Sequence, residues 1–126
     1  MLSRNIEKEI NTLSDEFPIV AILGPRQSGK TTLAKKIFGS YKYVSLEDMD
    51  SRDYAQNDPR GFLENYNANT IIDEIQRVPD LISYLQTHVD QNKKNRQFII
   101  TGSHNYLLMQ NISQSLAGRV GIAKLL

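Results

Sequence analysis

Residues 24–31 read GPRQSGKT and match the spacing G-x-x-x-x-G-K-T. Glycines at both ends of such a loop let the backbone wrap closely around a phosphate, with its N–H groups turned inward. Lys30 would add a positive charge for the β- and γ-phosphates, and the Thr31 hydroxyl would be a ligand of Mg²⁺. The pattern therefore predicts a phosphate-binding loop. The residues expected to contact a nucleotide are Gly24, Pro25, Arg26, Gln27, Ser28, Gly29, Lys30, Thr31 and Thr32.

Two acidic residues, Asp73 and Glu74, end a short apolar run at 70–72. Hydrolysis of a bound triphosphate requires a carboxylate that positions the metal and a group that activates water. We expect Asp73 to hold Mg²⁺ through a water molecule. Glu74 would act as the general base or would orient the attacking water. An acidic pair is common at the start of a loop, so this interpretation depends on the phosphate-binding loop beside it.

The segment FIITGS, residues 98–103, ends in two hydroxyl groups. In the expected sheet this strand lies between the strand before the phosphate-binding loop and the strand that ends at Asp73. A hydroxyl there would lie near the γ-phosphate and could sense it, whereas turn formation around Gly102 is the alternative. Thr101 is preferred to Ser103 as the candidate catalytic group because it closes the strand.

Arg119 stands in the segment SLAGRV, just before the last apolar run. An arginine in this place could contact a phosphate in its own chain, reach the nucleotide of a neighbouring subunit, or form a surface salt bridge. An arginine that reaches the transferring phosphoryl group contributes about 10³–10⁵ in rate. Arg119 is therefore a candidate catalytic residue, and its action in cis or in trans stays open.

The elements that must position these residues alternate between strands and helices. Apolar runs predict strands at 18–23, 41–46, 70–73, 98–101 and 121–126. Apolar residues at helical spacing predict helices at about 3–14, 31–38 and 80–91, with others beginning at 58 and 106. The polar, acidic stretch 47–58 predicts a loop with a short helix. This alternation predicts an α/β fold with a mainly parallel, five-stranded sheet flanked by helices.

Length and composition limit the classes of protein to which the chain can belong. A chain of 126 residues is one domain, 1–126, in which we expect an N-terminal helix ahead of a core at 18–126. The net charge of +1 argues against a strongly basic nucleic-acid coat, and the lack of cysteine excludes disulfide scaffolds and thiolate metal sites. The apolar runs are too short to span a membrane, and the charged start is unlike a secretory signal. We expect a cytoplasmic location.

The segments GPRQSGKTTLAKKIF, YVSLED, NTIIDEIQRVPDL, FIITGS and SLAGRV together resemble a prokaryotic AAA-like ATPase family. The resemblance covers nearly the whole chain, and GPRQ and DEIQ-x-Val-Pro are its most distinctive parts. It implies a P-loop NTPase core of the type with an additional strand, which binds ATP and Mg²⁺. Lys30 and Thr31 would contact nucleotide and metal, Asp73 and Glu74 would be the Walker B pair, and Arg119 matches the family's Gly-Arg.

Members of that family are much longer than this chain. They carry a helical lid and a C-terminal domain of unknown function that is restriction-endonuclease-like. The resemblance implies that residues 1–126 correspond to the N-terminal nucleotide-binding core, truncated before the lid. A core alone would have little turnover, and an unknown protein or nucleic-acid target would be bound through the missing region. A homo-oligomer is a further expectation of the resemblance.

Several functions share a phosphate-binding loop. The first is an ATPase whose hydrolysis drives a conformational change, and Glu74 favours it. The second is a nucleotide-gated binding module, in which occupancy switches a partner interaction with little or no turnover. A small-molecule kinase would need an arginine-rich lid, which the sequence lacks. A GTPase is disfavoured because Asn95 stands where the guanine-specifying N-K-x-D pattern needs Asp, and Gln76 where a D-x-x-G turn needs Gly.

Overall fold

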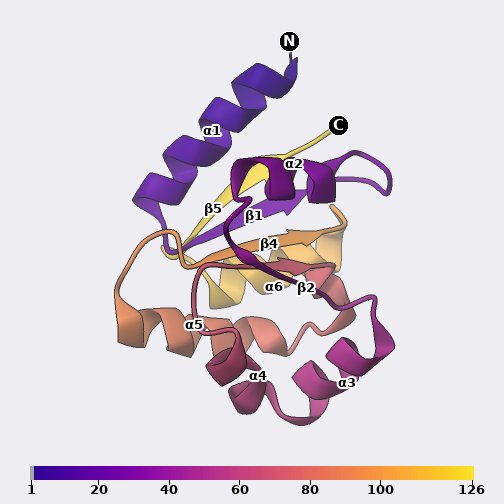
Figure 1. Ribbon diagram of the computed structural model, residues 1–126, viewed down its shortest axis with the longest axis vertical. Coiled ribbons are helices and arrows are strands. Elements are labelled where there is room, and N and C mark those ends of the chain that lie inside the picture. The colour runs from indigo at the N-terminus through magenta and orange to yellow at the C-terminus, as the bar shows by residue number, and fades with distance from the viewer. Residues whose placement is uncertain (1) are drawn as a thin grey trace.

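The computed structural model describes residues 2–126 and contains one five-stranded sheet, in which all neighbouring strands are parallel (Figure 1). The strand order is β2-β3-β4-β1-β5. This arrangement confirms the predicted fold class, including the position of the fourth strand between the first and the third. The strands are β1 (Ile19–Leu23), β2 (Lys42–Ser45), β3 (Thr70–Asp73), β4 (Phe98–Gly102) and β5 (Val120–Lys124).

The continuous apolar runs in the sequence form the centre of the sheet. Every residue of β1, β3 and β4 is buried, as expected for parallel strands that are covered on both faces. The two edge strands differ from them. In β5 buried residues alternate with more exposed ones, and in β2 only Val44 is fully buried. The edges are therefore less apolar than the centre.

Helices cover both faces of the sheet, and each face has its own apolar cluster (Figure 1). Helices α1 (Leu2–Glu16) and α2 (Lys30–Ile37) pack on one face through residues such as Ile10 and Ala34. The opposite face carries four helices and a short 3₁₀ turn. They are α3 (Met49–Asn57), α4 (Pro59–Asn65), η1 (Ile75–Arg77), α5 (Leu81–Asn92) and α6 (Tyr106–Ser115).

Most expected boundaries lie within two residues of those in the structure, and the stretch 47–58 differs more. The stretch 47–58 holds a nine-residue helix, α3, instead of a loop with a short helix. Asp48 caps it, because its carboxylate accepts from the N–H of Ser51 at 3.0 Å. Only Ala55 of α3 is buried, so no apolar spacing marks the helix in the sequence. The last strand is Val120–Lys124, one residue earlier than its predicted start and two residues short of its predicted end.

The strand order creates a topological switch point beside β1. The chain leaves β1 towards α2 on one face, whereas it leaves the neighbouring β4 towards α6 on the other face. The carboxyl ends of the two strands lie together, with Leu23 opposite Gly102. Ligands of open α/β sheets bind in the crevice at such a point. Within residues 2–126, no helix is long and apolar enough to cross a membrane.

Candidate functional site

The GPRQSGKT loop connects β1 to α2 and has two residues in the left-handed region. Gln27 has a φ of 60°, and Gly29, the N-cap of α2, has a φ of 86°. Such turns aim successive N–H groups at one point, and the α2 N-terminus is directed to the same place. Gly24 allows the loop to close tightly, since an added Cβ would lie 2.8 Å from Oγ of Ser28. The loop has the backbone of an anion cradle.

The Ser28 hydroxyl belongs to the same loop, but its side chain faces a different pocket, beside Leu33 and Leu125. Its oxygen is buried, and it has no hydrogen-bond partner among residues 2–126. A buried polar atom without a partner costs free energy, and native proteins keep few of them. A polar atom of a ligand in that pocket would satisfy the hydroxyl.

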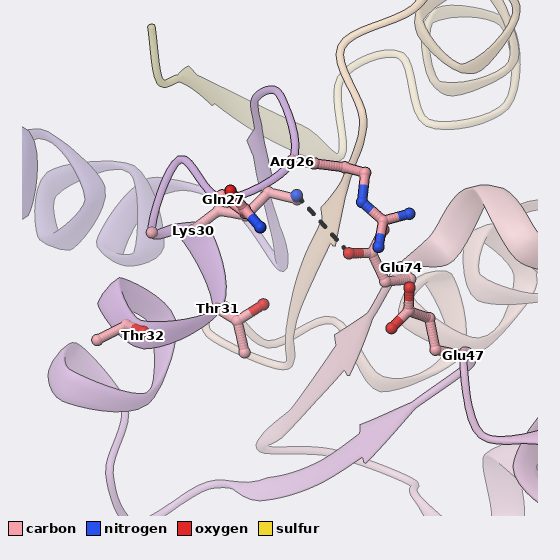
Figure 2. Close-up of a pocket in the computed structure, with 8 residues that line it drawn as sticks. Arg26, Gln27, Lys30, Thr31, Thr32, Glu47 and Glu74 are labelled. Atoms are coloured by element: carbon pink, nitrogen blue, oxygen red, sulfur yellow. Dashed lines mark ion pairs between the residues drawn. The ribbon is translucent and has the colours of Figure 1, made fainter.

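Lys30 lies at the start of α2 and is buried, with 4% of its surface exposed. Its Nζ lies 3.5 Å from the carbonyl oxygen of Pro25 and 3.6 Å from a carboxylate oxygen of Glu74 (Figure 2). The lysine charge is thus held between the loop and the end of β3. An anion that enters the loop would compete with Glu74 for this charge.

Asp73, the last residue of β3, is buried and accepts hydrogen bonds from four hydroxyl groups. One carboxylate oxygen accepts from Thr31 at 2.7 Å and from Thr101 at 2.6 Å. The other accepts from Tyr43 at 3.1 Å and from Ser45 at 3.3 Å. The structure therefore brings together Thr31 and Asp73, the two residues expected at the metal.

The donor set suits Mg²⁺ bound together with phosphates. Residues 2–126 contain no cluster of three or more histidine, aspartate or glutamate side chains that could hold a metal alone. Mg²⁺ typically uses one or two protein oxygens and takes its other ligands from water and substrate phosphates. The paired oxygens of Thr31 and Asp73 beside an anion cradle match that pattern.

The environment of Asp73 affects Tyr43 on the neighbouring strand. Burial of the ring, together with the nearby Asp73 carboxylate, raises the pKa of Tyr43 to about 12. The phenol therefore stays protonated and remains a hydrogen-bond donor to Asp73 at every physiological pH. Lys35 of α2 lies over the same ring, with its Nζ 3.9 Å from the ring centre.

Glu74 has an unusual backbone conformation directly after β3. Its φ of 60° and ψ of 53° place it in the left-handed region, which is uncommon for a residue of this type. Its N–H donates to the Thr101 hydroxyl at 3.1 Å. Thr101 is fully buried and spends its hydroxyl on Asp73 and Glu74. The hydroxyl that we expected to face the γ-phosphate instead connects the two acidic residues.

These side chains line a pocket of about 220 Å³, smaller than the 300–1,000 Å³ typical of whole-ligand sites. In Figure 2 the Lys30 and Glu74 side chains point towards one another across it, and Arg26 extends from the loop towards Glu74 and Glu47. This pocket suits the phosphates of a ligand. It is lined by Arg26, Gln27, Gly29, Lys30, Thr31, Thr32, Glu47 and Glu74.

A second, larger pocket of about 490 Å³ shares Gly29 with the first. It lies between α1, α2 and the end of the chain after β5. Ile6, Leu33 and Leu125 give it apolar walls, and Ser28 lines it next to Gly29. The phosphate-binding loop therefore separates a polar pocket from a more apolar one.

Arg119 is not brought to this site. It immediately precedes β5, at the amino ends of the strands, and its carbonyl oxygen accepts from the N–H of Ile19. The phosphate-binding loop lies at the carboxyl ends of the strands. The two places are separated by the length of a five-residue strand, which is about 16 Å. The guanidinium instead makes two hydrogen bonds to Asp90, at 2.6 and 2.8 Å. The structure thus contradicts the option that Arg119 contacts phosphate in its own chain.

Ser103, the weaker hydroxyl candidate, takes part in the turn chemistry that was the alternative. Its hydroxyl accepts from the Asn105 side chain at 2.7 Å, and Asn105 caps α6. Four further residues at the site were not predicted from the sequence: Tyr43, Ser45, Glu47 and Gln76. The first two stand two positions apart on β2, which aims them at one face of the sheet. Gln76 belongs to the DEIQ segment, which was singled out only as a family feature.

Comparisons with known proteins show the family of this chain. The family described as "AAA domain" matches residues 16–126. An uncharacterised protein of Mycobacterium bovis and one of Mycobacterium tuberculosis are each 37% identical to the chain over 109 residues. The matches cover 86% of this chain and 25% of each relative, so the chain spans about a quarter of their length.

Two solved structures share the fold. A DNA replication initiation factor superposes with a TM-score of 0.59 at 13% identity, covering 97% of this chain and 44% of its own. The Aeropyrum pernix ORC2 protein, solved in its ADP form, gives 0.56 at 18% identity, with coverage of 98% and 46%. The chain belongs to the AAA domain family, and it is a P-loop nucleotide-binding domain.

Proposed function

We propose that this AAA domain binds Mg-ATP at the loop between β1 and α2 and hydrolyses it, and that the nucleotide state changes the conformation of the site. One observation carries the proposal. Lys30, Thr31 and Glu74 line one pocket, in which Lys30 lies 3.6 Å from Glu74. Thr31 donates from there to the buried Asp73 at the end of β3, at 2.7 Å.

The loop would hold the phosphates. Backbone N–H groups from Gly29 onwards and the charge of Lys30 would bind the triphosphate oxygens. Arg26 extends into the same pocket and would add a second positive charge (Figure 2). Gln27 and Thr32, which also line this pocket, would complete the contacts.

Thr31 and Asp73 would hold Mg²⁺, and the ion would neutralise charge that develops on the phosphate oxygens. Asp73 fits this role because its carboxylate is buried and directed by hydroxyl groups on neighbouring strands. Hydroxyl donors orient the carboxylate without neutralising it, whereas a cation in their place would cancel its charge. Thr101 and Tyr43 would therefore act as positioning residues for the metal-binding carboxylate.

Glu74 would orient the attacking water and accept its proton. In this structure its carboxylate lies against Lys30. Phosphates bound in the loop would draw the lysine charge to themselves and release the carboxylate, because their charge is larger and closer to the loop. Nucleotide binding and activation of the base would then be coupled through a single side chain.

The base and ribose would extend into the apolar pocket beyond Gly29. Ile6 of α1, Leu33 of α2 and Leu125 after β5 give it an apolar surface on which an adenine ring could pack. The related fold of the Aeropyrum pernix protein in its ADP form favours an adenine nucleotide over a guanine one. The absence of the N-K-x-D pattern from the sequence points the same way.

Arg119 would act only in trans. It would have to leave Asp90 and reach the pocket of a second copy of the chain, which requires a homo-oligomer. In the nucleotide-gated alternative neither Arg119 nor Glu74 is needed for chemistry. The contact between Lys30 and Glu74 supports this alternative, because Glu74 stays paired with the lysine until phosphate binds.

Single-turnover hydrolysis separates the two proposals. The chain is placed in excess over radiolabelled ATP with Mg²⁺, conditions that detect rates far below one per second. We expect slow release of phosphate that Glu74→Gln reduces about 10²-fold, the lower range for loss of a general base. Lys30→Ala serves as the control for a contaminating ATPase. Binding of Mg-ATP with no hydrolysis above the Lys30→Ala rate would overturn hydrolysis and leave the gated module.

A further inference from the structure

Gln76 lies two residues after Glu74, in the 3₁₀ turn η1, and its side chain spans the end of the sheet. The amide nitrogen donates to one carboxylate oxygen of Glu74 at 2.7 Å. The amide oxygen accepts from the backbone N–H of Ser103 at 3.3 Å. The side chain thus links Glu74, after β3, to the loop between β4 and α6.

The two ends of the amide have different partners, and only one orientation satisfies both. A carboxylate can only accept, and a backbone N–H can only donate. Turning the amide over would place its oxygen against Glu74 and its nitrogen against the Ser103 N–H. Neither of those contacts is a hydrogen bond. The surroundings of Gln76 therefore fix a donor towards Glu74.

The backbone leaves room for this side chain at Gly102. A Cβ built at position 102 would lie 2.8 Å from the amide oxygen of Gln76 and 2.8 Å from a methyl carbon of Leu108. Real Cβ atoms do not approach other atoms so closely. Gly102 has no positive φ, so a side chain there would meet no backbone strain but would have to displace the ends of the Gln76 and Leu108 side chains.

Glu74 needs such support because its backbone is held in the left-handed region. That conformation is strained for an ordinary residue and persists only where the surroundings hold it. Thr101 holds the backbone N–H at 3.1 Å, and Gln76 holds the carboxylate. The two contacts fix the residue at both ends.

We infer that Gln76 is a positioning residue for Glu74, which keeps the carboxylate aimed into the pocket when Lys30 turns to the phosphates. This inference rests on the proposed role of Glu74 in hydrolysis. Lys30 and Gln76 contact different oxygens of the carboxylate, so one can leave without the other. The amide is neutral and leaves the negative charge of Glu74 in place, whereas a lysine neutralises it.

A double-mutant cycle with Glu74→Gln tests the inference in the single-turnover assay. Gln76→Met keeps the length of the side chain and removes the amide. We expect it to lower the hydrolysis rate about 10- to 100-fold, the effect of losing a hydrogen bond to a charged group, with the affinity for Mg-ATP within about twofold. In the Glu74→Gln background, Gln76→Met should cost nothing further, because the residue acts through Glu74.

Two variants complete the design. Gln110→Met changes a glutamine that lines the groove beside Gln76 on α6, and it should leave the rate unchanged. Gln76→Glu places a second carboxylate against Glu74 and should be slower than Gln76→Met. An unchanged rate in Gln76→Met, or an equal loss in both backgrounds of the cycle, would overturn the inference. If Glu74→Gln itself hydrolyses at the full rate, the proposed function fails instead.

The side-chain amide resonances of Gln76 give a readout that does not need activity. In the wild-type chain the hydrogen-bonded NH₂ pair should be widely split in a ¹⁵N NMR spectrum. Glu74→Ala should move the pair to the position of a free glutamine amide, while circular dichroism shows that the fold is kept. Resonances that stay in place in Glu74→Ala would show that Gln76 is not held by Glu74, and would contradict the inference.

Discussion

Asp73 receives more hydrogen bonds than any other side chain that we assign to the site. The hydroxyl groups of Thr31, Tyr43, Ser45 and Thr101 all donate to it, from one helix and two neighbouring strands. A buried carboxylate that accepts only neutral donors keeps its full charge, and that charge is available to a cation. Glu74, one residue later, contacts a lysine and an amide instead. Adjacent acidic residues thus have distinct environments, which supports distinct roles.

Asp73→Asn should separate these roles. We expect the affinity for Mg-ATP to fall at least tenfold while the affinity for ATP in EDTA stays nearly constant, because the change removes a metal-holding charge. Glu74→Gln should raise both affinities together and keep their dependence on Mg²⁺, because Lys30 loses a partner that competes with phosphate. Titrations of a fluorescent ATP analogue with and without Mg²⁺ measure both quantities. If the two variants lose Mg²⁺ dependence equally, the division of roles between Asp73 and Glu74 is wrong.

Tyr43 gives a prediction for the dependence of stability on pH. Its pKa of about 12 in the folded chain lies above the value of about 10 in an unfolded chain. Between these values the native state keeps a proton that the unfolded state has lost, so stability falls as pH rises from 10 to 12. Below pH 10 the stabilisation is fully present.

Tyr43→Phe should reduce that loss of stability between pH 10 and 12. Urea unfolding at several pH values measures the change, and tyrosinate absorbance follows the titration directly. Of the six tyrosines, one should titrate near pH 12 in the wild-type chain and be missing in the variant. Asp73→Asn should lower the pKa of Tyr43, since part of the shift comes from its charge. An identical high-pH titration in Tyr43→Phe would contradict the assignment.

At the level of elements, continuous apolar runs were enough to predict the centre of the fold. The runs at 19–23, 70–73 and 98–102 form buried strands, and α2 follows the glycine-rich loop as expected. The stretch 47–58 was expected to be a loop with a short helix, and the length of α3 was underestimated because it buries only Ala55 and has no apolar stripe. Local patterns record burial, and an exposed helix held by its cap leaves little trace in them.

The same reasoning explains which site contacts were predictable. The phosphate-binding loop and the acidic pair are contiguous in sequence, so their residue types can be recognised together. The contacts of Tyr43 with Asp73 and of Gln76 with Ser103 join different strands and loops. They depend on strand order and register, with Ser45 opposite Asp73, which no local pattern specifies. The buried placement of Thr101 depends on the same packing.

Gly102 at the end of β4 provides a test at this scale. Gly102→Ala would force its new Cβ against Gln76 and Leu108, and overpacking of this kind typically costs about 1–3 kcal/mol. Gly39→Ala is a matched control, because its Cβ would meet only a backbone oxygen at 3.4 Å. Urea unfolding should show destabilisation in the first variant and a change within about 0.5 kcal/mol in the second. Equal stabilities would mean that the end of β4 is not tightly packed.

In the molecule as a whole, the residues at the carboxyl ends of the strands differ from those at the amino ends. The carboxyl ends of the strands carry the loop, both carboxylates and the adjoining apolar pocket. The amino ends of the strands carry Arg119, which is paired with Asp90. The described residues therefore offer a nearly complete set of phosphate contacts and a shallow place for the base, without an arginine from a neighbour. We therefore expect weak nucleotide binding and low turnover, because positioning and charge stabilisation supply most of the catalysis in phosphoryl transfer.

Titration of the chain with Mg-ATP, followed by the backbone amide resonances of the loop, is the most direct test of the central claim. We expect a dissociation constant in the high-micromolar to millimolar range, or about −4 to −6 kcal/mol, with the largest shifts around Gly29. Lys30→Ala should weaken binding at least tenfold, because it removes the buried charge of the loop. Lys94→Ala, which removes an exposed charge between α5 and β4, should leave binding unchanged. Equal binding by the wild-type chain and Lys30→Ala would contradict the account.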